Sequence, residues 1–476
     1  MSENYRTLEE IRQALEKGEE TSLHLTKKYM DRIAKYDKNK TKINAIIELN
    51  PDAIHIAEAL DTEREQTGSR GPLHGIPILL KDNIDTGDKM HTSAGSIALA
   101  TNYAKADSFV AKKLREAGAL ILGKANLTEW ANFMTEGMPN GYSSRGGQVL
   151  NPYGPGRIDV GGSSSGPAAA VAAGFAAASI GTETSGSILS PASSNSLVGI
   201  KPTVGLISRT GIIPIAHSQD TAGPLTRTVT DSAILLGVLA GVDELDPATR
   251  TSIKNKEFDY TKHLNSDGLK GARIGVDRNY LAELDSDELG LVEKAIEDMK
   301  AQGAKIIDPV EIATNPSNYT VLFHEFKSDL NAYLANLSAN VPVHSLAEVI
   351  KYNLDHADST LKYGQKLLLE SEEKSGTLTE AEYIDARLED LKLSKEKGID
   401  AVIKEHQLDA LLFANNYGAD IAAKAGYPSI TVPAGYTTGE RPIGITLTGT
   451  AYNEAKLIEL AYGYEQATKH RKNPSL

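Results

Sequence analysis

Two clusters of glycine and hydroxyl residues are the part of this sequence best suited to chemistry. The first, residues 161–166, is Gly-Gly-Ser-Ser-Ser-Gly, and the second, residues 181–187, is Gly-Thr-Glu-Thr-Ser-Gly-Ser. An alanine-rich segment, residues 167–177, separates them. Glycine adopts backbone angles that other residues avoid, and short side chains leave backbone N–H groups accessible. The pattern therefore favours a serine nucleophile beside a group of amide donors.

A lysine is the candidate base for such a serine. Lys81 ends the segment Gly-Ile-Pro-Ile-Leu-Leu-Lys that begins at Gly75. Lysine is normally charged at neutral pH, with a pKa of about 10.4, but burial disfavours the charged form. The apolar residues before Lys81 predict a buried strand end. The next residue, Asp82, would raise the lysine pKa if it faced the amine, but successive side chains on a strand point to opposite faces.

Two motif matches offer alternatives. Residues 162–166 fit the Gly-x-Ser-x-Gly nucleophile elbow of α/β-hydrolases, with Ser164 as nucleophile and an esterase as the implied enzyme. That motif should follow a hydrophobic strand, whereas residues 152–160 predict a loop, and only His406 and His470 follow as candidate bases. Residues 118–125 resemble a phosphate-binding loop but lack its final hydroxyl residue.

The sequence contains no pattern that indicates a metal site or a cofactor. There are no cysteines, which excludes disulfides, cysteine nucleophiles and Cys-ligated zinc, and the eleven histidines show no metal-ligand spacing. We therefore predict no cofactor and no metal. His217 is predicted to be structural or to line the substrate pocket, and the single tryptophan, Trp130, is predicted to pack in the core.

Alternating strand and helix patterns predict an α/β layered fold. Apolar residues at spacings of three and four predict helices within residues 6–36, with Thr21 or Ser22 as a cap. The remaining helices are predicted at residues 108–117, 166–173, 288–302 and 453–468, and strands at 76–80, 119–122, 176–180, 304–307, 408–413, 429–432 and 444–447. Residues 242–272 predict a surface connection, and residues 316–400 a helical segment that covers part of the pocket.

Charge and length exclude some partners. The chain has 476 residues and a formal net charge of −13, which argues against a nucleic-acid partner because phosphate binding needs a positive field. No apolar run approaches the ~20 residues of a membrane-spanning helix, and residues 1–17 lack the apolar core of a secretory signal. The sequence predicts a cytoplasmic enzyme without membrane partners and makes no prediction of oligomeric state.

Taken together, the motifs resemble the amidase signature family. Ser163 and Ser187 are 24 residues apart, as the two catalytic serines of that family are. Residues 75–82 match its Gly-x-Pro-x-x-x-Lys-Asp motif. Further matching segments are residues 122–129, 199–203, 220–224 and 425–433. The likeness covers most of the chain and is weakest between residues 242 and 400.

The resemblance implies a fold and a set of roles. The fold would be a single large domain, with a mixed β-sheet covered on both faces by α-helices. Its parts would be N-terminal helices (1–60), a catalytic core (61–235), a variable, largely helical substrate-covering segment (242–400), and C-terminal strands and a helix (401–476). Ser187 would be the nucleophile, Ser163 the bridging serine after a cis peptide bond, and Lys81 the base. Backbone N–H groups of residues 184–187, which are Thr184, Ser185, Gly186 and Ser187, would form the oxyanion hole.

Four positions depart from the common family pattern. Ser165 and Ser185 replace glycines, Glu183 replaces aspartate, and Leu189 replaces arginine. None removes a catalytic side chain, but Ser185 places a Cβ where the backbone must approach the substrate. These variants look like the peptide-amidase branch, which implies a small-molecule or peptide amide substrate. A second role, an amidotransferase subunit that delivers ammonia in a larger complex, is disfavoured by the short segment at residues 413–426.

Overall fold

One large mixed β-sheet organises the chain. The computed structural model describes residues 5–39, 41–255, 257–313 and 318–476. Eleven strands form the sheet in the order β1-β3-β2-β6-β8-β7-β12-β13-β11-β9-β10, and β4 and β5 form a separate hairpin. The strands are β1 Ile46–Leu49, β2 Pro77–Lys81, β3 Leu120–Ala125, β4 Tyr142–Ser143, β5 Gly147–Gln148, β6 Ala178–Glu183, β7 Val198–Lys201, β8 Thr221–Thr226, β9 Arg273–Val276, β10 Lys305–Ile307, β11 Ala410–Ala414, β12 Ser429–Tyr436 and β13 Pro442–Thr448.

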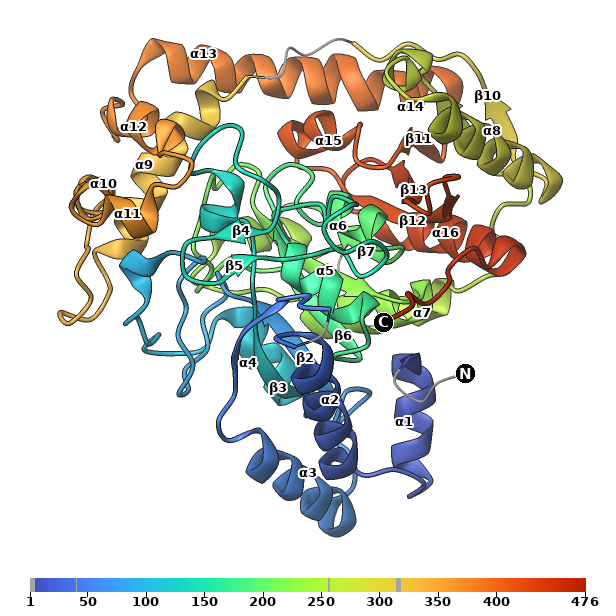
Figure 1. The fold of residues 1–476 in the computed structure, drawn as a ribbon. Coiled ribbons are helices and arrows are strands. Elements are labelled where there is room, and N and C mark those ends of the chain that lie inside the picture. The colour runs from blue at the N-terminus through green and yellow to red at the C-terminus, as the bar shows by residue number, and fades with distance from the viewer. Residues whose placement is uncertain (1–4, 40, 256, 314–317) are drawn as a thin grey trace.

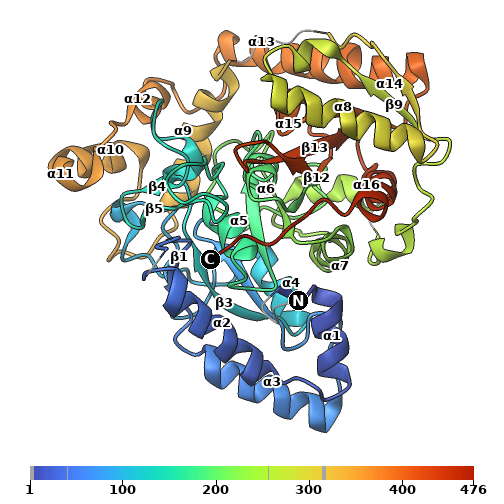
Figure 2. The same ribbon diagram turned by 45° about the vertical axis from the view of Figure 1, so that its right-hand side comes forward.

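Helices cover both faces of this sheet (Figures 1 and 2). They are α1 Leu8–Glu16, α2 Ser22–Tyr36, α3 Ala53–Thr67, α4 Phe109–Glu116, α5 Ser165–Ala172, α6 Leu189–Ser194, α7 Val229–Leu239, α8 Ser286–Ala301, α9 Thr320–Leu334, α10 Leu346–Asp355, α11 Ala357–Thr360, α12 Lys366–Glu372, α13 Ala381–Asp390, α14 Asp400–His406, α15 Ala419–Ala425 and α16 Glu454–Thr468. The predicted fold class, a mixed sheet between helices, is confirmed.

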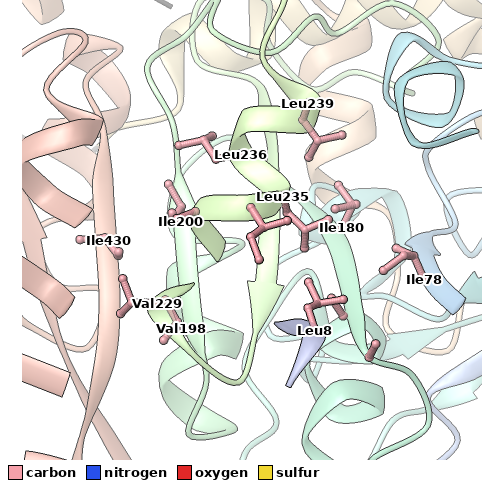
Figure 3. Close-up of a cluster of buried hydrophobic side chains, with 14 of the residues drawn as sticks. Leu8, Ile78, Ile180, Val198, Ile200, Val229, Leu235, Leu236, Leu239 and Ile430 are labelled. Carbon is pink, nitrogen blue, oxygen red and sulfur yellow. The ribbon is translucent and has the colours of Figure 1, made fainter. Parts of the chain in front are cut away.

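The central strands are buried on both faces, because helices pack above and below them. Every residue of β2, β3, β6 and β8 is buried. Figure 3 shows one side of this core, where Leu235 and Leu236 of α7 pack near Ile180 of β6 and Ile200 of β7. Apolar side chains on both faces explain why β2 and the first half of β3 show continuous hydrophobic runs and not alternation.

Strand directions bring the functional segments to one edge. β2 pairs in parallel with β3 and with β6, so the carboxyl ends of all three strands lie together. β8 runs antiparallel to β6, with Glu183 opposite Thr221. The end of β2, the end of β6 and the start of β8 therefore meet at the same place. Helix α5 precedes β6 in the chain, and the first hydroxyl cluster, residues 161–166, leads into its first turn.

A second apolar cluster attaches the covering helices to the core. Trp130 is 1% exposed and belongs to this cluster, together with Phe326 of α9 and Leu346 of α10. Core packing is the role predicted for Trp130, and it is confirmed. Helices α9 to α13 occupy residues 320–390, which agrees with the predicted helical segment.

The structure also corrects the sequence analysis in places. Residues 242–272 are not only a surface connection, because Tyr260 and Leu269 are buried in the main core. The segment 242–400 is not only a cover, since it supplies β9 and β10 to one edge of the sheet. Sequence patterns missed β1, β4, β5, β7, β8, β9, α3, α6, α7, α14 and α15. No helix in the described ranges is long and apolar enough to cross a membrane.

Candidate active site

Lys81 is the last residue of β2 and is completely buried. Its Nζ atom lies 2.8 Å from Ser163 Oγ. It also lies 2.9 Å from the Oγ1 atom and 3.2 Å from the carbonyl oxygen of Thr182, near the end of β6. The parallel pairing of β2 and β6 explains this contact, because it places the two strand ends side by side. The structure thus joins Lys81 to Ser163, as the sequence predicted.

Burial controls the charge of this lysine. Removal from water lowers the pKa of Lys81 to about 7, while the negative charges of Glu183 and Asp220 act in the opposite direction. Asp82 does not face the amine. Its carboxylate accepts a hydrogen bond from the Ser93 hydroxyl and lies 3.5 Å from Arg145 Nη1. The alternation of side chains along β2 therefore keeps Asp82 away from Lys81.

Ser163 and Ser164 have different environments. The peptide bond between Gly162 and Ser163 is cis, as the family resemblance implied. Ser164 is fully buried, its hydroxyl donates to the carbonyl oxygen of Thr182 at 3.0 Å, and it accepts from the Thr182 N–H at 3.3 Å. These contacts hold Ser164 against the backbone of β6, which disfavours it as the nucleophile of an α/β-hydrolase elbow.

The turn after β6 carries the second hydroxyl cluster. Glu183 is buried, and its carboxylate accepts hydrogen bonds from the N–H groups of Ile188 (2.6 Å) and Leu189 (3.0 Å). The N–H of Gly186 also faces this carboxylate. Gly186 has a φ of +79°, a left-handed conformation that favours glycine. Hydrogen bonds to Glu183 therefore fix the end of the turn that leads from residues 184–187 into α6.

The other three backbone N–H groups of residues 184–187 donate no hydrogen bond to any residue that the structure describes. Thr184 is anchored through its side chain, which donates to Asp220 Oδ1 at 2.5 Å. Ser185 is exposed, so its Cβ does not enter the core. These three N–H groups are thus available to a ligand.

Ser187 lies beside the first cluster but is not bonded to Ser163. The N–H of Ser164 donates to the carbonyl oxygen of Ser187 at 3.1 Å, which brings the two clusters together. The Ser187 residue is 8% exposed. Its hydroxyl forms no hydrogen bond with the described residues. The link between Ser163 and Ser187 therefore stays a prediction.

A cavity of about 370 Å³ opens next to these residues. Asn83, Thr182, Thr184 and Asp220 line it at the catalytic end, and α9 contributes Asp329, Ala332 and Tyr333. Apolar lining comes from Ala131, Ile212, Ile213, Pro214, Ile215, Leu245 and Pro247. Its size falls within the range of small-molecule sites.

Charged residues of the cavity wall are paired with one another. Arg209 forms two hydrogen bonds with Asp246, of 2.8 and 2.6 Å. His217 Nδ1 lies 2.8 Å from Asp329 Oδ2, and hydrogen bonding to Asp329 raises the pKa of this histidine. His217 lines the cavity, as one of its two predicted roles required.

One group of side chains has metal-ligand geometry that the sequence did not reveal. His217, Glu325 and Asp329 offer ligand atoms within 4.8 Å of one another. Glu325 already accepts from the Tyr383 hydroxyl and the Ser218 N–H. The distance between His217 and α9 along the chain hid this group from spacing rules. The carboxylates of Glu325 and Asp329 already accept hydrogen bonds from protein donors, so these contacts explain the clustering of the three side chains without a metal ion.

Sequence reasoning missed three residues of the site. Thr182 and Asn83 are bonded to each other at 3.0 Å through the Thr182 hydroxyl, and Asp220 accepts from Thr184 and from the N–H groups of Ile215 and Ala216. Asn83 directly follows the lysine motif, and Asp220 begins a segment that matched the family, so both positions carried a signal. Thr182 could be found only from the strand pairing.

Comparisons with known proteins agree with this geometry. The pattern of the Amidase family matches residues 24–458. A probable amidase of Arabidopsis thaliana is 42% identical over 481 residues, covering 98% of this chain and 91% of the relative. One component of the glutamyl-tRNA(Gln) amidotransferase of Thermoanaerobacter pseudethanolicus is 33% identical, with 98% and 97% covered.

A solved structure extends the agreement to three dimensions. The native peptide amidase of Stenotrophomonas maltophilia has a TM-score of 0.92 and 43% sequence identity, with 98% of each chain covered. The family pattern and the relatives both extend over nearly the whole chain. The chain therefore belongs to the amidase family and is an amidase, a hydrolase of the C–N bond of carboxylic amides.

Proposed function

We propose that this amidase works through an acyl-enzyme, with Ser187 as nucleophile, Ser163 as proton carrier and Lys81 as base. One observation carries the proposal. Lys81 Nζ, fully buried, lies 2.8 Å from the Ser163 hydroxyl, and the described residues give it no carboxylate within ion-pair distance. An amine in this setting gives up its proton near neutral pH, because burial disfavours the charged form and no carboxylate forms an ion pair with it.

The contacts of Lys81 fit the neutral amine. A neutral amine has two N–H donors and one lone pair. The two N–H groups have acceptors in the carbonyl oxygen and the hydroxyl of Thr182. The lone pair is then left for the proton of the Ser163 hydroxyl. A proton can move from Ser163 to Lys81 without any change of partners.

The chemical steps balance as follows. The Ser187 oxygen attacks the amide carbon while its proton passes to Ser163, whose own proton passes to Lys81. The C–N bond then breaks as the relay returns a proton to the departing nitrogen, which leaves as ammonia or an amine. Water repeats the sequence on the ester, releasing the acid. The Ser163–Ser187 hydrogen bond would form with substrate bound, since catalytic hydrogen bonds are often long in free enzymes.

The N–H groups of residues 184–187 are proposed to stabilise the oxyanion. The freedom of three of them from protein acceptors supports this role. Each oxyanion donor contributes roughly 3 kcal/mol to the stability of a transition state. Glu183 and Asp220 would act as positioning residues, since they hold the two sides of the turn.

A neutral amide fits the cavity better than an anionic one. The two cationic side chains of its wall, Arg209 and His217, are already bonded to Asp246 and Asp329. A substrate carboxylate would therefore find no unpaired cation there. This favours primary amides, including peptides with a C-terminal amide, and the solved peptide amidase supports the same class. It disfavours glutamine, the nitrogen donor that an amidotransferase role would require.

Substitution of the two candidate nucleophiles, Ser187 and Ser164, tests the proposal. Ser187→Ala should abolish both turnover of a peptide amide and labelling by a serine-reactive phosphonate, and no acyl-enzyme should appear by intact mass. Ser164→Ala should retain turnover. The opposite pattern would establish the esterase alternative with Ser164 as nucleophile. Gel filtration of the active chain on its own would separate a self-sufficient hydrolase from an amidotransferase subunit, which needs a complex.

A further inference from the structure

A second cavity lies between residues 5–10 and the C-terminal segment, away from the residues assigned to catalysis. The cavity has a volume of about 370 Å³. Its wall consists of residues from the N-terminal segment, the start of α7, strand β12 and the C-terminal segment: Tyr5, Thr7, Glu10, Arg227, Thr228, Val432, Pro433, Glu465, Gln466, Thr468, Lys469, His470, Arg471 and Asn473.

Arg227 is a buried cation in this wall, only 3% exposed. Its Nη1 donates to the carbonyl oxygens of Val171 (3.2 Å) and Ala176 (3.0 Å), and its Nη2 donates to that of Arg6 (2.5 Å). Its Nε–H is buried and has no acceptor among the described residues. Asp231 of α7 attracts the guanidinium from beyond ion-pair distance. The guanidinium therefore has neutral acceptors but no carboxylate in direct contact in the described part of the chain.

Arg471 is a second cation of this wall, and it is half-buried. Its Nη1 donates to Asn473 Oδ1 at 2.6 Å, while Nε and Nη2 are buried without a described acceptor. Burial is the main reason that the pKa of Arg471 is lowered, and the like charge of Arg227 adds to the effect. Two guanidinium groups thus repel each other across the cavity wall. Removing an ion from water without a counter-charge costs several kcal/mol.

The acidic groups of the wall, Glu10 and Glu465, offset only part of this positive charge. Lys469 adds a third cation. Glu465 accepts from the Val229 N–H at 2.8 Å, and burial raises its pKa to about 7, so only part of its charge is present at neutral pH. Glu10 accepts from the Thr7 N–H. The 11-residue helix α7 starts at the cavity, and its N-terminus adds positive potential.

We propose that this cavity binds a small oxyanion, a carboxylate or a phosphate, between the guanidinium groups of Arg227 and Arg471. Planar guanidinium donors match both anions, and charge-assisted hydrogen bonds would satisfy the orphaned N–H groups. The site is separate from the proposed catalytic function and does not depend on it.

A bound anion would stabilise the backbone next to the catalytic region through Arg227. Arg227 holds the carbonyl oxygens of Val171 and Ala176, which lie between the serine cluster at the start of α5 and Thr182 of β6. Neutralising its charge removes the repulsion from Arg471 and should stabilise the folded state. The effect to measure is thus a rise in the unfolding temperature.

Thermal unfolding and calorimetry of the full chain test the proposal. The wild type is titrated with inorganic phosphate and, separately, with succinate, each against sodium chloride at equal ionic strength. We expect one binding site per chain and a saturable rise of about 2–3 °C at a hundredfold excess over Kd, for a protein of this size. Binding of either anion would support the site and identify its preferred ligand.

Variants separate a defined site from general salt effects. Arg471→Gln should weaken binding at least tenfold and so reduce the rise by about half or more. Arg471→Lys should have a smaller effect, because it keeps the charge and loses only the planar donor. Arg250→Gln, which changes an exposed arginine paired with Glu244, is the matched control and should behave as wild type. The proposal is overturned if calorimetry of the wild type detects neither anion at millimolar concentration. It is also overturned if Arg471→Gln shows the same rise, because excluded salts stabilise proteins without a site.

Discussion

The charge state of Lys81 makes the strongest prediction, because it controls the rate through pH. With a pKa of about 7, half of the Lys81 side chains are neutral at pH 7. An ordinary lysine, with a pKa of about 10.4, would be neutral at pH 7 in roughly one molecule of 2,500. Burial therefore increases the population of the active base by about three orders of magnitude. At pH 5, two units below the pKa, about 1% should remain neutral, so kcat/KM should fall about a hundredfold from its plateau.

Replacing Lys81 by methionine should remove this pH dependence together with the activity. A general base contributes about 10²–10⁴-fold to the rate, so Lys81→Met should lose at least a hundredfold in kcat/KM. Lys124→Met is a matched control. Lys124 is equally buried on the neighbouring strand β3, and its Nζ contacts the Ile84 carbonyl oxygen and Thr92 Oγ1, but neither serine. It should keep the wild-type pH profile, even if its stability falls.

The assay is release of ammonia from a neutral peptide amide between pH 5 and 9, with circular dichroism to verify folding. Unfolding provides a second readout. Because the folded pKa of Lys81 lies below the value of 10.5 for the free side chain, the unfolded chain binds more protons between pH 7 and 10.5. The contribution of Lys81 to the free energy of unfolding should therefore rise with pH in that window and be absent in Lys81→Met. A rate that is flat from pH 5 to 8, or an active Lys81→Met enzyme, would refute the reasoning.

Three further perturbations test the surroundings of the site. Gly186→Ala adds a Cβ to a residue in the left-handed conformation, and this Cβ would lie 3.0 Å from Asn416 Nδ2. We therefore expect a free energy of unfolding about 1 kcal/mol lower and a kcat at least tenfold lower. The control is Ser185→Ala, an exposed neighbour, which should match the wild type in denaturant titration and in turnover. Thr182→Val removes a hydroxyl acceptor of Lys81, so kcat should fall about tenfold with little change in KM; a change in KM alone would contradict a positioning role. Excess EDTA should leave turnover unchanged. A loss of activity on EDTA treatment that added zinc restores would contradict a mechanism based on lysine and serine alone.

Local sequence patterns were sufficient for the elements next to the catalytic residues. The apolar run before Lys81 forms β2, and the alanine-rich segment forms α5 and leads into β6. The structure joins Lys81 to Ser163, but the matching contact of Ser163 with Ser187 was inferred from resemblance and not from any local signal. Spacing between the two serines indicates shared function, and it does not determine the orientation of either hydroxyl.

The remaining parts of the site depend on contacts that no local pattern encodes. Strand β8 contains glycine and proline, which weaken the strand signal, so the sequence did not predict that Asp220 meets the end of β6. Helix α7 is apolar on all sides and buried, so it shows no amphipathic period. The cavity wall formed by α9 comes from residues more than 100 positions away from His217. Tertiary packing alone brings these groups together.

The neutrality of Lys81 rests on how the surrounding carboxylates are engaged. Asp82 faces Ser93 and Arg145 on the other side of β2, Glu183 accepts backbone N–H groups of the nucleophile turn, and Asp220 accepts from Thr184 and two backbone N–H groups. Each acid accepts hydrogen bonds from donors other than the amine, and none lies within ion-pair distance of it. These hydrogen bonds hold the carboxylates away from the amine, so burial can lower the lysine pKa to about 7. A substitution that frees one of these carboxylates should therefore impair catalysis by raising the lysine pKa as well as by loosening the turn.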